Sequence, residues 1–194
     1  MQGYRGKYLK CCLDKILAGA GLILLAPLFF LIIVAIKLEG LFRPERCGPA
    51  FERAPRINQG KPFSILKFRT NWKMGEDGSP ITAAGRHLRR WYLDELPQLW
   101  HILRGEMSFV GPRPVPPWQY ENYMRSGNEA KRILIPGLAG PTQGTKRRTD
   151  GRSAKDYELE YLRAYDAASQ LGVLRLDAHW ALETIRTALR GEGE

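Results

Sequence analysis

The most prominent feature of the hydropathy pattern is an apolar run near the N-terminus. Residues 16–36 are 21 consecutive residues without a charge, and as a helix they would measure about 31 Å and could cross a bilayer. Pro27 lies within this run and is expected to kink the helix. Basic residues flank the run on both sides, namely Lys10, Lys15, Lys37, Arg43 and Arg46. Both ends are therefore expected on the same side of a membrane, which favours a re-entrant helix broken at Ala26-Pro27, although the residues alone leave a straight span equally open.

Beyond this run, the pattern predicts short helices and strands. Strands are expected over 63–70 and 108–110, and helices over 85–93, 118–131, 154–171 and 173–190. The stretches 43–60 and 135–144 are rich in Gly and Pro and are expected to be irregular, with a turn at 75–79 and a mobile basic run at 146–148. The last helix carries an apolar stripe that is expected to pack on the domain or to lie on a membrane, and its members are Leu174, Ala178, Ala181, Ile185 and Ala188.

These elements indicate an α+β protein that is mostly helical and has a small β element. The chain has 194 residues, of which 44% are hydrophobic. That is enough for one domain with a buried core and too little for two large ones. We therefore expect a membrane-associated segment at 1–40, which contains the re-entrant helix, and one domain at 41–194.

The chemistry is concentrated in residues 93–114, which read LDELPQLWHILRGEMSFVGPRP. Asp94 fits as the N-cap of a helix, because Pro97 then falls in the first turn, apolar residues follow at helical spacing and Gly105 fits as the end. The N-terminus of a helix keeps a carboxylate ionised and also attracts phosphate oxygens. Asp94 and Glu95 are therefore candidate catalytic residues, and the alternative is that they are only a cap and a first-turn acid.

Several basic residues are candidates for phosphate contacts. Arg113 follows a short predicted strand and lies between Pro112 and Pro114, so a stiff loop would present its guanidinium for bidentate recognition. Two further pairs are expected to share a face, Lys67 with Arg69 on a strand and Arg86 with Arg90 on a helix. For each of these groups a solvent-exposed position without a ligand is the alternative.

The overall charge points to acidic partners. The formal net charge is +10 and the pI is about 9.7, which suits nucleic acid, anionic lipid or phosphate-bearing substrates. The apolar run favours the membrane among these. Cys11, Cys12 and Cys47 have neither metal-ligand nor redox spacing and are interpreted as reduced.

The run DELPQLWHILRGEMSFVGPRP, together with KFRT at 67–70 and GRHLRR at 85–90, closely resembles the bacterial sugar transferase family. Members of this family are monotopic polyprenyl-phosphate phosphoglycosyl transferases. The resemblance covers roughly residues 8 to 190, and the family's PG-x-x-G followed by Gln is matched by Pro136, Gly137, Gly140 and Gln143. Three positions depart from the family pattern: His101 stands where Asn is usual, Asn71 where Met is usual, and Ala26 where many members have Ser.

The resemblance implies an enzyme of the bacterial inner membrane with its catalytic domain on the cytoplasmic face. It implies transfer of a sugar-1-phosphate from a UDP-sugar to polyprenyl phosphate, with Asp94 as the nucleophile and Glu95 helping to bind Mg²⁺. Substrate phosphate would be held by Arg113, with Lys67, Arg69, Arg86, Arg90 and Gln143 as weaker candidates.

The partners implied are the two substrates and membrane lipid, with a homodimer left open and no nucleic acid. One alternative is a membrane-anchored, basic lipid- or nucleic-acid-binding protein without catalysis. Another is a one-step transfer in which Asp94 only positions the metal.

Overall fold

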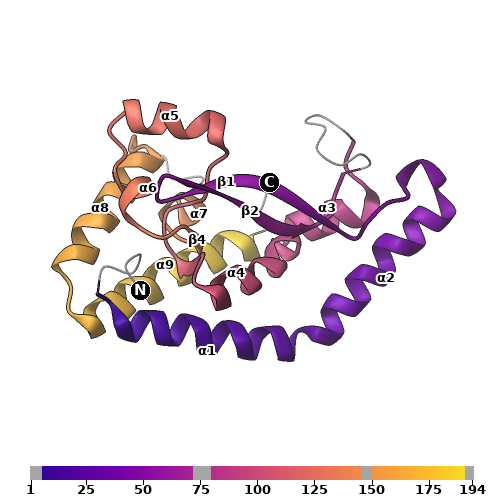
Figure 1. Cartoon of the computed structure of the whole chain (residues 1–194), viewed down its shortest axis with the longest axis horizontal. Coiled ribbons are helices and arrows are strands. Elements are labelled where there is room, and N and C mark those ends of the chain that lie inside the picture. The colour runs from indigo at the N-terminus through magenta and orange to yellow at the C-terminus, as the bar shows by residue number, and fades with distance from the viewer. Residues whose placement is uncertain (1–5, 72–79, 146–149, 191–194) are drawn as a thin grey trace.

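The computed structural model describes residues 6–71, 80–145 and 150–190. It begins with two helices, α1 (Tyr8–Leu24) and α2 (Ala26–Phe42), that form one edge of the molecule (Figure 1). The break falls at Leu25, and the two helices meet at a bend of 57°. Pro27 is tolerated there because it lies in the first turn of α2, where its absent N–H costs little. The predicted bend is confirmed, one residue before the predicted position.

Among the helices of the described ranges, none is by itself long and apolar enough to cross a membrane, and only the bent pair of α1 and α2 together has the length and composition to do so.

The prediction of an irregular connector over 43–60 is wrong for residues 51–58. After a short 3-10 helix, η2 (Pro44–Arg46), the chain forms β1 (Phe51–Asn58), which pairs antiparallel with β2 (Lys61–Phe68). A two-residue turn joins the strands, and both Gln59 and Gly60 have positive φ. Such turns match the twist of a hairpin. The predicted strand at 63–70 is confirmed up to Phe68.

The predicted helix capped by Asp94 is also wrong in its start. After α3 (Ala83–Arg90), residues Leu93–Gln98 form the 3-10 helix η3, and only then does α4 (Leu99–Arg104) begin. Tyr92, in the left-handed conformation at φ 55°, takes the N-cap position of η3, and Asp94 is the second residue of η3. Pro97 lies inside η3. The predicted end at Gly105 and the strand β3 (Ser108–Val110) are confirmed.

The C-terminal half adds α5 (Pro117–Arg125), α6 (Ala130–Ile133), β4 (Gly137–Ala139), α7 (Pro141–Gly144), α8 (Ala154–Ala167) and α9 (Gln170–Leu189). The predicted helix at 118–131 is thus interrupted after Arg125, where Gly127 has positive φ. The predicted irregular loop at 135–144 instead contains β4, which pairs in parallel with β3. The break between the last two helices falls at residues 168–169 and not at Gly172 as predicted. Ser169 caps α9 by accepting from the Gly172 N–H, so Gly172 lies in the first turn of α9. The turn at 75–79 and the run at 146–148 lie outside the described residues.

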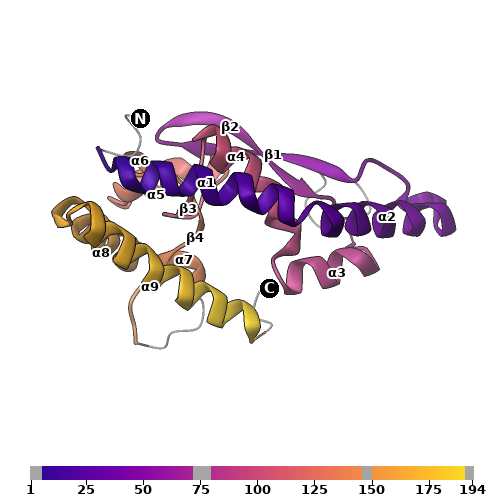
Figure 2. The ribbon, with the colours of Figure 1, turned by 90° about the horizontal axis from the view of Figure 1, so that it is seen from below.

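The N-terminal helices share their apolar cores with the rest of the chain. Ala18 of α1 packs in one cluster with Leu99 and Ile102 of α4, and Ile36 of α2 packs in another with Phe68 at the end of β2. A third cluster joins α6, α8 and α9. Figure 2 shows α9 and α3 lying on one side of the long α1–α2 edge. The structure confirms a mostly helical α+β fold with two small sheets.

The apolar stripe predicted on the last helix is not its buried face. The residues of α9 that are buried are Val173, Asp177, Trp180 and Thr187. Ala178 and Ile185 of the predicted stripe are exposed, and so are Leu182 and Leu189. The remaining members of the stripe, Leu174, Ala181 and Ala188, are partly buried, and Ala181 packs against the third cluster. The stripe therefore packs on the domain only in part, and a position against a membrane stays a prediction.

Candidate active site

Asp94 and Glu95 lie side by side in η3, next to β2. Only 7% of Asp94 and 5% of Glu95 are exposed, and burying a carboxylate is costly unless a cation compensates it. Lys67 in β2 provides the first cation. Its Nζ lies 2.9 Å from Glu95 Oε1 and 3.6 Å from Asp94 Oδ2. The hairpin and η3 thus bring together residues that are 28 positions apart in the chain.

Arg113 reaches the same pair from the loop that follows β3. Its Nη2 donates to Glu95 Oε1 at 2.9 Å, so this oxygen accepts from two cations. Within the described ranges, Asp94 accepts no hydrogen bond from another side chain and has only the longer ion pair with Lys67. The structure therefore joins four of the predicted site residues and binds one carboxylate much more tightly than the other.

The two carboxylates consequently differ in proton affinity. Burial by itself would raise the pKa of Glu95, but the charges of Arg113 and Lys67 outweigh it and lower this pKa to about 2. For Asp94 burial prevails and raises the pKa above its ordinary value of 3.8, with Lys67 opposing the rise and Glu95 adding to it. The site therefore contains one permanent anion and one more basic carboxylate.

Arg89, which the sequence analysis did not select, is the arginine of α3 whose charge acts on Asp94. Its Nε donates to Thr70 Oγ1 and its Nη2 to Asn71 Oδ1, both at 2.8 Å. The departure at Asn71 thus supplies an acceptor that a Met would lack. Arg86 and Arg90 are exposed on α3, and Arg90 lies over the Trp91 ring. Their proposed phosphate contacts stay predictions.

Glu52 is a third carboxylate near the pair, and the sequence analysis missed it because the strand β1 was not predicted. It pairs with Lys67 across the hairpin. Burial raises its pKa, the charge of Lys67 opposes this rise, and the charge of Asp94 adds to it. Arg69 also acts on Glu52 but is itself buried, packed against Gly48. The substrate contact predicted for Arg69 would need its guanidinium to become accessible.

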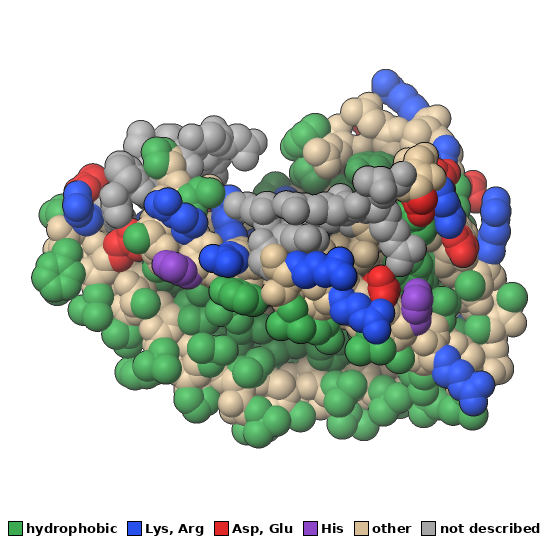
Figure 3. Space-filling view, turned by 180° about the vertical axis from the view of Figure 1, so that it is seen from behind, with side chains coloured by type: hydrophobic (Ala, Val, Ile, Leu, Met, Phe, Trp, Pro, Cys, Tyr) green, Lys and Arg blue, Asp and Glu red, His purple; other side chains and the backbone are tan. Residues whose placement is uncertain are grey.

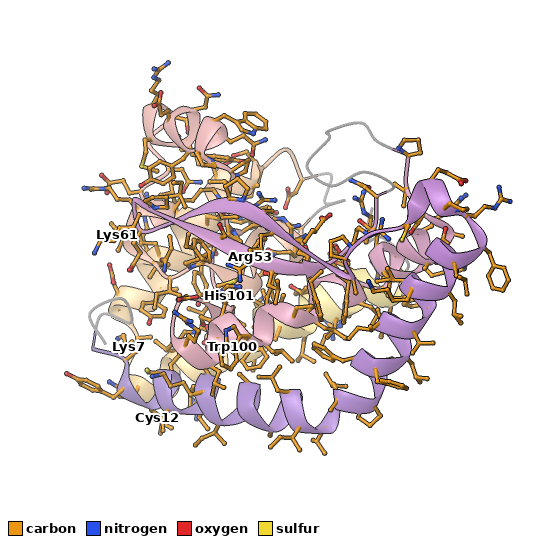
Figure 4. The ribbon with its side chains drawn as sticks, turned by 45° about the vertical axis from the view of Figure 1, so that its right-hand side comes forward. Lys7, Cys12, Arg53, Lys61, Trp100 and His101 are labelled. Carbon is orange, nitrogen blue, oxygen red and sulfur yellow. The ribbon has the colours of Figure 1, made fainter. Side chains whose placement is uncertain are left out.

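His101 lies on α4 beneath the hairpin (Figure 4) and connects the two. Its Nε2 accepts from the backbone N–H of Leu66 at 3.0 Å, and its Nδ1 lies 2.7 Å from Glu106 Oε2. Because Nε2 must be unprotonated to accept, the proton lies on Nδ1 and is donated to Glu106. His101 therefore attaches β2 to α4 next to Lys67, and the hydrogen bonds of its ring go to Leu66 and Glu106 and not to Asp94 or Glu95.

Glycines pack the Arg113 loop against the loop that contains β4. A Cβ on Gly137 would lie 2.1 Å from Gly111 N, and one on Gly140 would lie 2.1 Å from Gly111 O. A side chain at either position would therefore displace the backbone of the Arg113 loop. Gln143 follows in α7, buried, with its Nε2 donating to Leu138 O at 3.0 Å. Its substrate contact stays a prediction.

The donor atoms suit a divalent cation that is only partly bound by protein. Among the described residues, no three His, Cys, Asp or Glu side chains are arranged to hold a metal ion. Mg²⁺ typically takes one or two carboxylates and completes its shell with water and substrate phosphate. Asp94 and Glu95, with one oxygen of Glu95 already held by cations, fit that partial role.

Comparison with known proteins identifies the class. The family model described as bacterial sugar transferase matches residues 5–191. The chain therefore belongs to the bacterial sugar transferase family, as the resemblance of the 93–114 stretch predicted.

Particular relatives are similar over most of the chain. The UDP-glucose:undecaprenyl-phosphate glucose-1-phosphate transferase of Caulobacter vibrioides is 40% identical over 69% of this chain and 52% of its own length. The protein of the same name from Escherichia coli K12 is 33% identical over 82% of this chain and 37% of its own length. A UDP-N-acetylgalactosamine-undecaprenyl-phosphate N-acetylgalactosaminephosphotransferase of Aeromonas hydrophila is 28% identical over 96% of this chain and 45% of its own length. The chain thus spans between about a third and a half of the length of these relatives.

Proposed function

We propose that this protein transfers a sugar-1-phosphate from a UDP-sugar to polyprenyl phosphate, which yields a polyprenyl-diphosphate-sugar and UMP. The reaction would be the first membrane step of bacterial glycoconjugate assembly. The observation that carries the proposal is the pair Asp94 and Glu95, buried together, with only Glu95 held by two cations. The family and the names of the relatives support the reaction class.

The difference between the two carboxylates supports a division of roles. Glu95 is fixed by Lys67 and Arg113 and stays ionised, so it suits an electrostatic or metal-binding role. Asp94 does not have a comparable pair of hydrogen bonds from cationic side chains, and its pKa is raised. Its carboxylate oxygen is therefore more basic and less restrained from reaching a phosphorus atom. We assign the nucleophile to Asp94 for this reason.

In the proposed reaction, an Asp94 oxygen attacks the phosphorus that carries the sugar. The bond from that phosphorus to the bridging oxygen breaks, and UMP leaves with the electron pair. An oxygen of polyprenyl phosphate then attacks the same phosphorus, and the Asp94 carboxylate departs unchanged. Arg113, Lys67 and Arg89 lie where they can offset the negative charge of the phosphates during both steps.

Mg²⁺ bound at Asp94 and Glu95 would screen the negative charge of the donor diphosphate and so assist departure of UMP. Since the protein provides only part of its coordination shell, the ion would enter together with the donor. The structure gives the two carboxylates a strongly cationic surrounding, which keeps Glu95 ionised and ready for this role even without the ion.

A membrane location would bring the lipid-linked acceptor to the site. The outer face of α1 and α2 exposes large apolar side chains, including Ile16, Ile23, Leu24, Phe30 and Leu31. Figure 3 shows hydrophobic side chains along this lower edge and a row of Lys, Arg and His above it. This pattern supports a re-entrant segment with basic groups at the lipid headgroups, on the cytoplasmic side of the inner membrane.

The test uses the full chain in detergent or nanodiscs with Mg²⁺ and a panel of UDP-sugars. With the right sugar and no polyprenyl phosphate, the protein should release about one UMP per site and gain the mass of a phosphosugar. Asp94→Asn should abolish both signals, whereas Asp166→Asn, an exposed substitution of the same type on α8, should retain them.

Two outcomes would separate the alternatives. If UMP appears only when both substrates are present and no adduct forms on Asp94, transfer occurs in one step. If no UDP-sugar yields UMP even with polyprenyl phosphate, while the protein still binds anionic vesicles, the non-catalytic lipid-binding alternative takes precedence.

A further inference from the structure

We propose, on the basis of the function above, that two buried lysines, Lys10 and Lys131, are positioning residues for Arg113. Each donates to a backbone carbonyl at one end of the segment Val110–Arg113. Together they would hold this loop so that the Arg113 guanidinium faces Glu95.

Lys10 holds the first end of the loop. It lies in α1, and its Nζ donates to Val110 O at 3.1 Å. Only 3% of Lys10 is exposed, and its charge is balanced by Asp177 of α9, whose Oδ2 lies 2.5 Å away. The Tyr161 hydroxyl of α8 donates to Asp177 Oδ1 at 2.7 Å and lies 3.3 Å from Val110 O. The Val110 carbonyl is therefore contacted from α1 and α8, and Asp177 of α9 binds both of the contacting side chains.

Lys131 holds the second end. It lies in α6, and its Nζ donates to Arg113 O at 3.0 Å and to Glu158 Oε1 at 2.8 Å. Glu158 is 1% exposed and also accepts from Asn128, at 2.6 Å, and from Thr142, at 2.5 Å. The backbone of the residue that contacts Glu95 is thus fixed by a separate buried ion pair on the other side of the loop.

The atoms between the two ends are held by ordinary sheet contacts. Gly111 N donates to Ala139 O, and Gly137 N donates to Pro112 O, both at 3.0 Å. These bonds attach the middle of the loop to β4, and side chains bind the carbonyls at its two ends. Lys131 donates to Arg113 O, and Lys10 shares Val110 O with the hydroxyl groups of Ser108 and Tyr161.

An apolar core at these positions would be the simpler solution for stability. Burying an ammonium group is costly, and well-packed apolar residues often replace a buried ion pair without loss. Such a replacement would leave the Arg113 carbonyl without a donor, and the loop would be free to shift. A displacement of about 1 Å at a substrate-contacting group can cost about a hundredfold in rate. We therefore expect the lysines to contribute more to the position of the Arg113 loop than to the free energy of unfolding.

The first test is a double-mutant cycle. Lys131→Met should lower kcat/KM for the UDP-sugar by between about ten- and a hundredfold. In an Arg113→Lys background the same change should cost less than about threefold, because Lys131 acts through Arg113. Arg132→Met is the matched control, since Arg132 is the next residue of α6 and forms an exposed pair with Glu129. Lys131→Arg keeps a charged donor and should recover much of the activity.

A second variant separates position from folding. Lys131→Met combined with Glu158→Gln removes both buried charges. The melting temperature of this double variant should therefore be close to that of wild type, while its kcat/KM for the UDP-sugar should stay low. Hydrogen exchange should then be faster at the amides of Gly111 and Arg113 and unchanged in the hairpin 51–68. Lys10→Met with Asp177→Asn should give the same exchange pattern but a lower melting temperature, because buried Asp14 then loses its ion pair with Lys10.

The inference is overturned if the Lys131→Met effect is equally large in both backgrounds, or if exchange in the loop is unchanged in the double variant. If wild-type protein releases no UMP, the proposed function fails instead. Hydrogen exchange then decides alone whether the lysines hold the loop.

Discussion

The tight binding of Glu95 makes a quantitative prediction about stability in acid. Its pKa is lowered from an ordinary value of 4.5 to about 2, because Arg113 and Lys67 outweigh the effect of burial. At about 1.4 kcal/mol per pKa unit, this corresponds to about 3 kcal/mol of folding free energy when Glu95 is ionised in both states. Arg113 is one-third exposed, so solvent screening makes this figure an upper estimate.

The sign follows from proton binding. A depressed pKa means that the unfolded chain takes up a proton before the folded one does, so acid favours unfolding. The stabilisation is complete above about pH 4.5 and is lost as the pH falls from 4.5 towards 2. At pH 3 roughly two-thirds of it, about 2 kcal/mol, should be gone.

The assay compares wild type with Glu95→Gln by urea unfolding in detergent at pH 7 and pH 3. At pH 7 the free energy of unfolding should be larger for wild type than for Glu95→Gln. This difference should be about 2 kcal/mol smaller at pH 3. Glu121→Gln, an exposed change on α5, should leave the wild-type pH dependence intact. If the advantage over Glu95→Gln is the same at both pH values, Glu95 is not held as an anion and the reasoning is refuted.

Further predictions concern the same site and the N-terminal helices. Arg113→Lys keeps the charge but loses the planar fork, so UMP release should fall about tenfold or more with little change in melting temperature; a large loss of stability with normal turnover would contradict this. Arg89→Gln should move the acid limb of the kcat/KM profile to higher pH, because Arg89 lowers the pKa of Asp94; an unmoved limb, as expected for Arg125→Gln, would exclude that influence. With Cys11, Cys12 and Cys47 replaced by Ser, new cysteines at Gly3 and Glu45 should be labelled from the same side of the membrane, and Pro27→Leu should place them on opposite sides. Opposite-side labelling without the Pro27 change would rule out the re-entrant topology.

Much of the organisation is already contained in local sequence. Residues 16–36 are apolar, and Pro27 interrupts their helical pattern, so the bend between α1 and α2 is predictable from side-chain chemistry alone. The stretch 93–114 contains its two carboxylates, its glycine stop and its proline-flanked arginine within a single window. Short-range signals of this kind do not depend on what the chain folds against.

The errors arise where long-range contacts override local preference. Residues 51–58 look irregular because of Pro55 and the basic residues, and they become a strand only because β2 is available to pair with them. Asp94 fits as a helix cap in the sequence, yet η3 lies against β2 and adopts a tighter 3-10 turn that directs the carboxylate towards Lys67 instead. Neither outcome follows from a single segment.

The apolar N-terminal segment and the residues that carry the candidate chemistry can be read from the amino-acid sequence. Which cations meet which carboxylates depends on the folded arrangement, since the charge of Arg89, which local sequence does not single out, acts on Asp94, and Lys67 and Arg113 converge on one oxygen of Glu95. A pKa depends on burial and on charges a few ångströms away, and segments that are distant in the sequence contribute both.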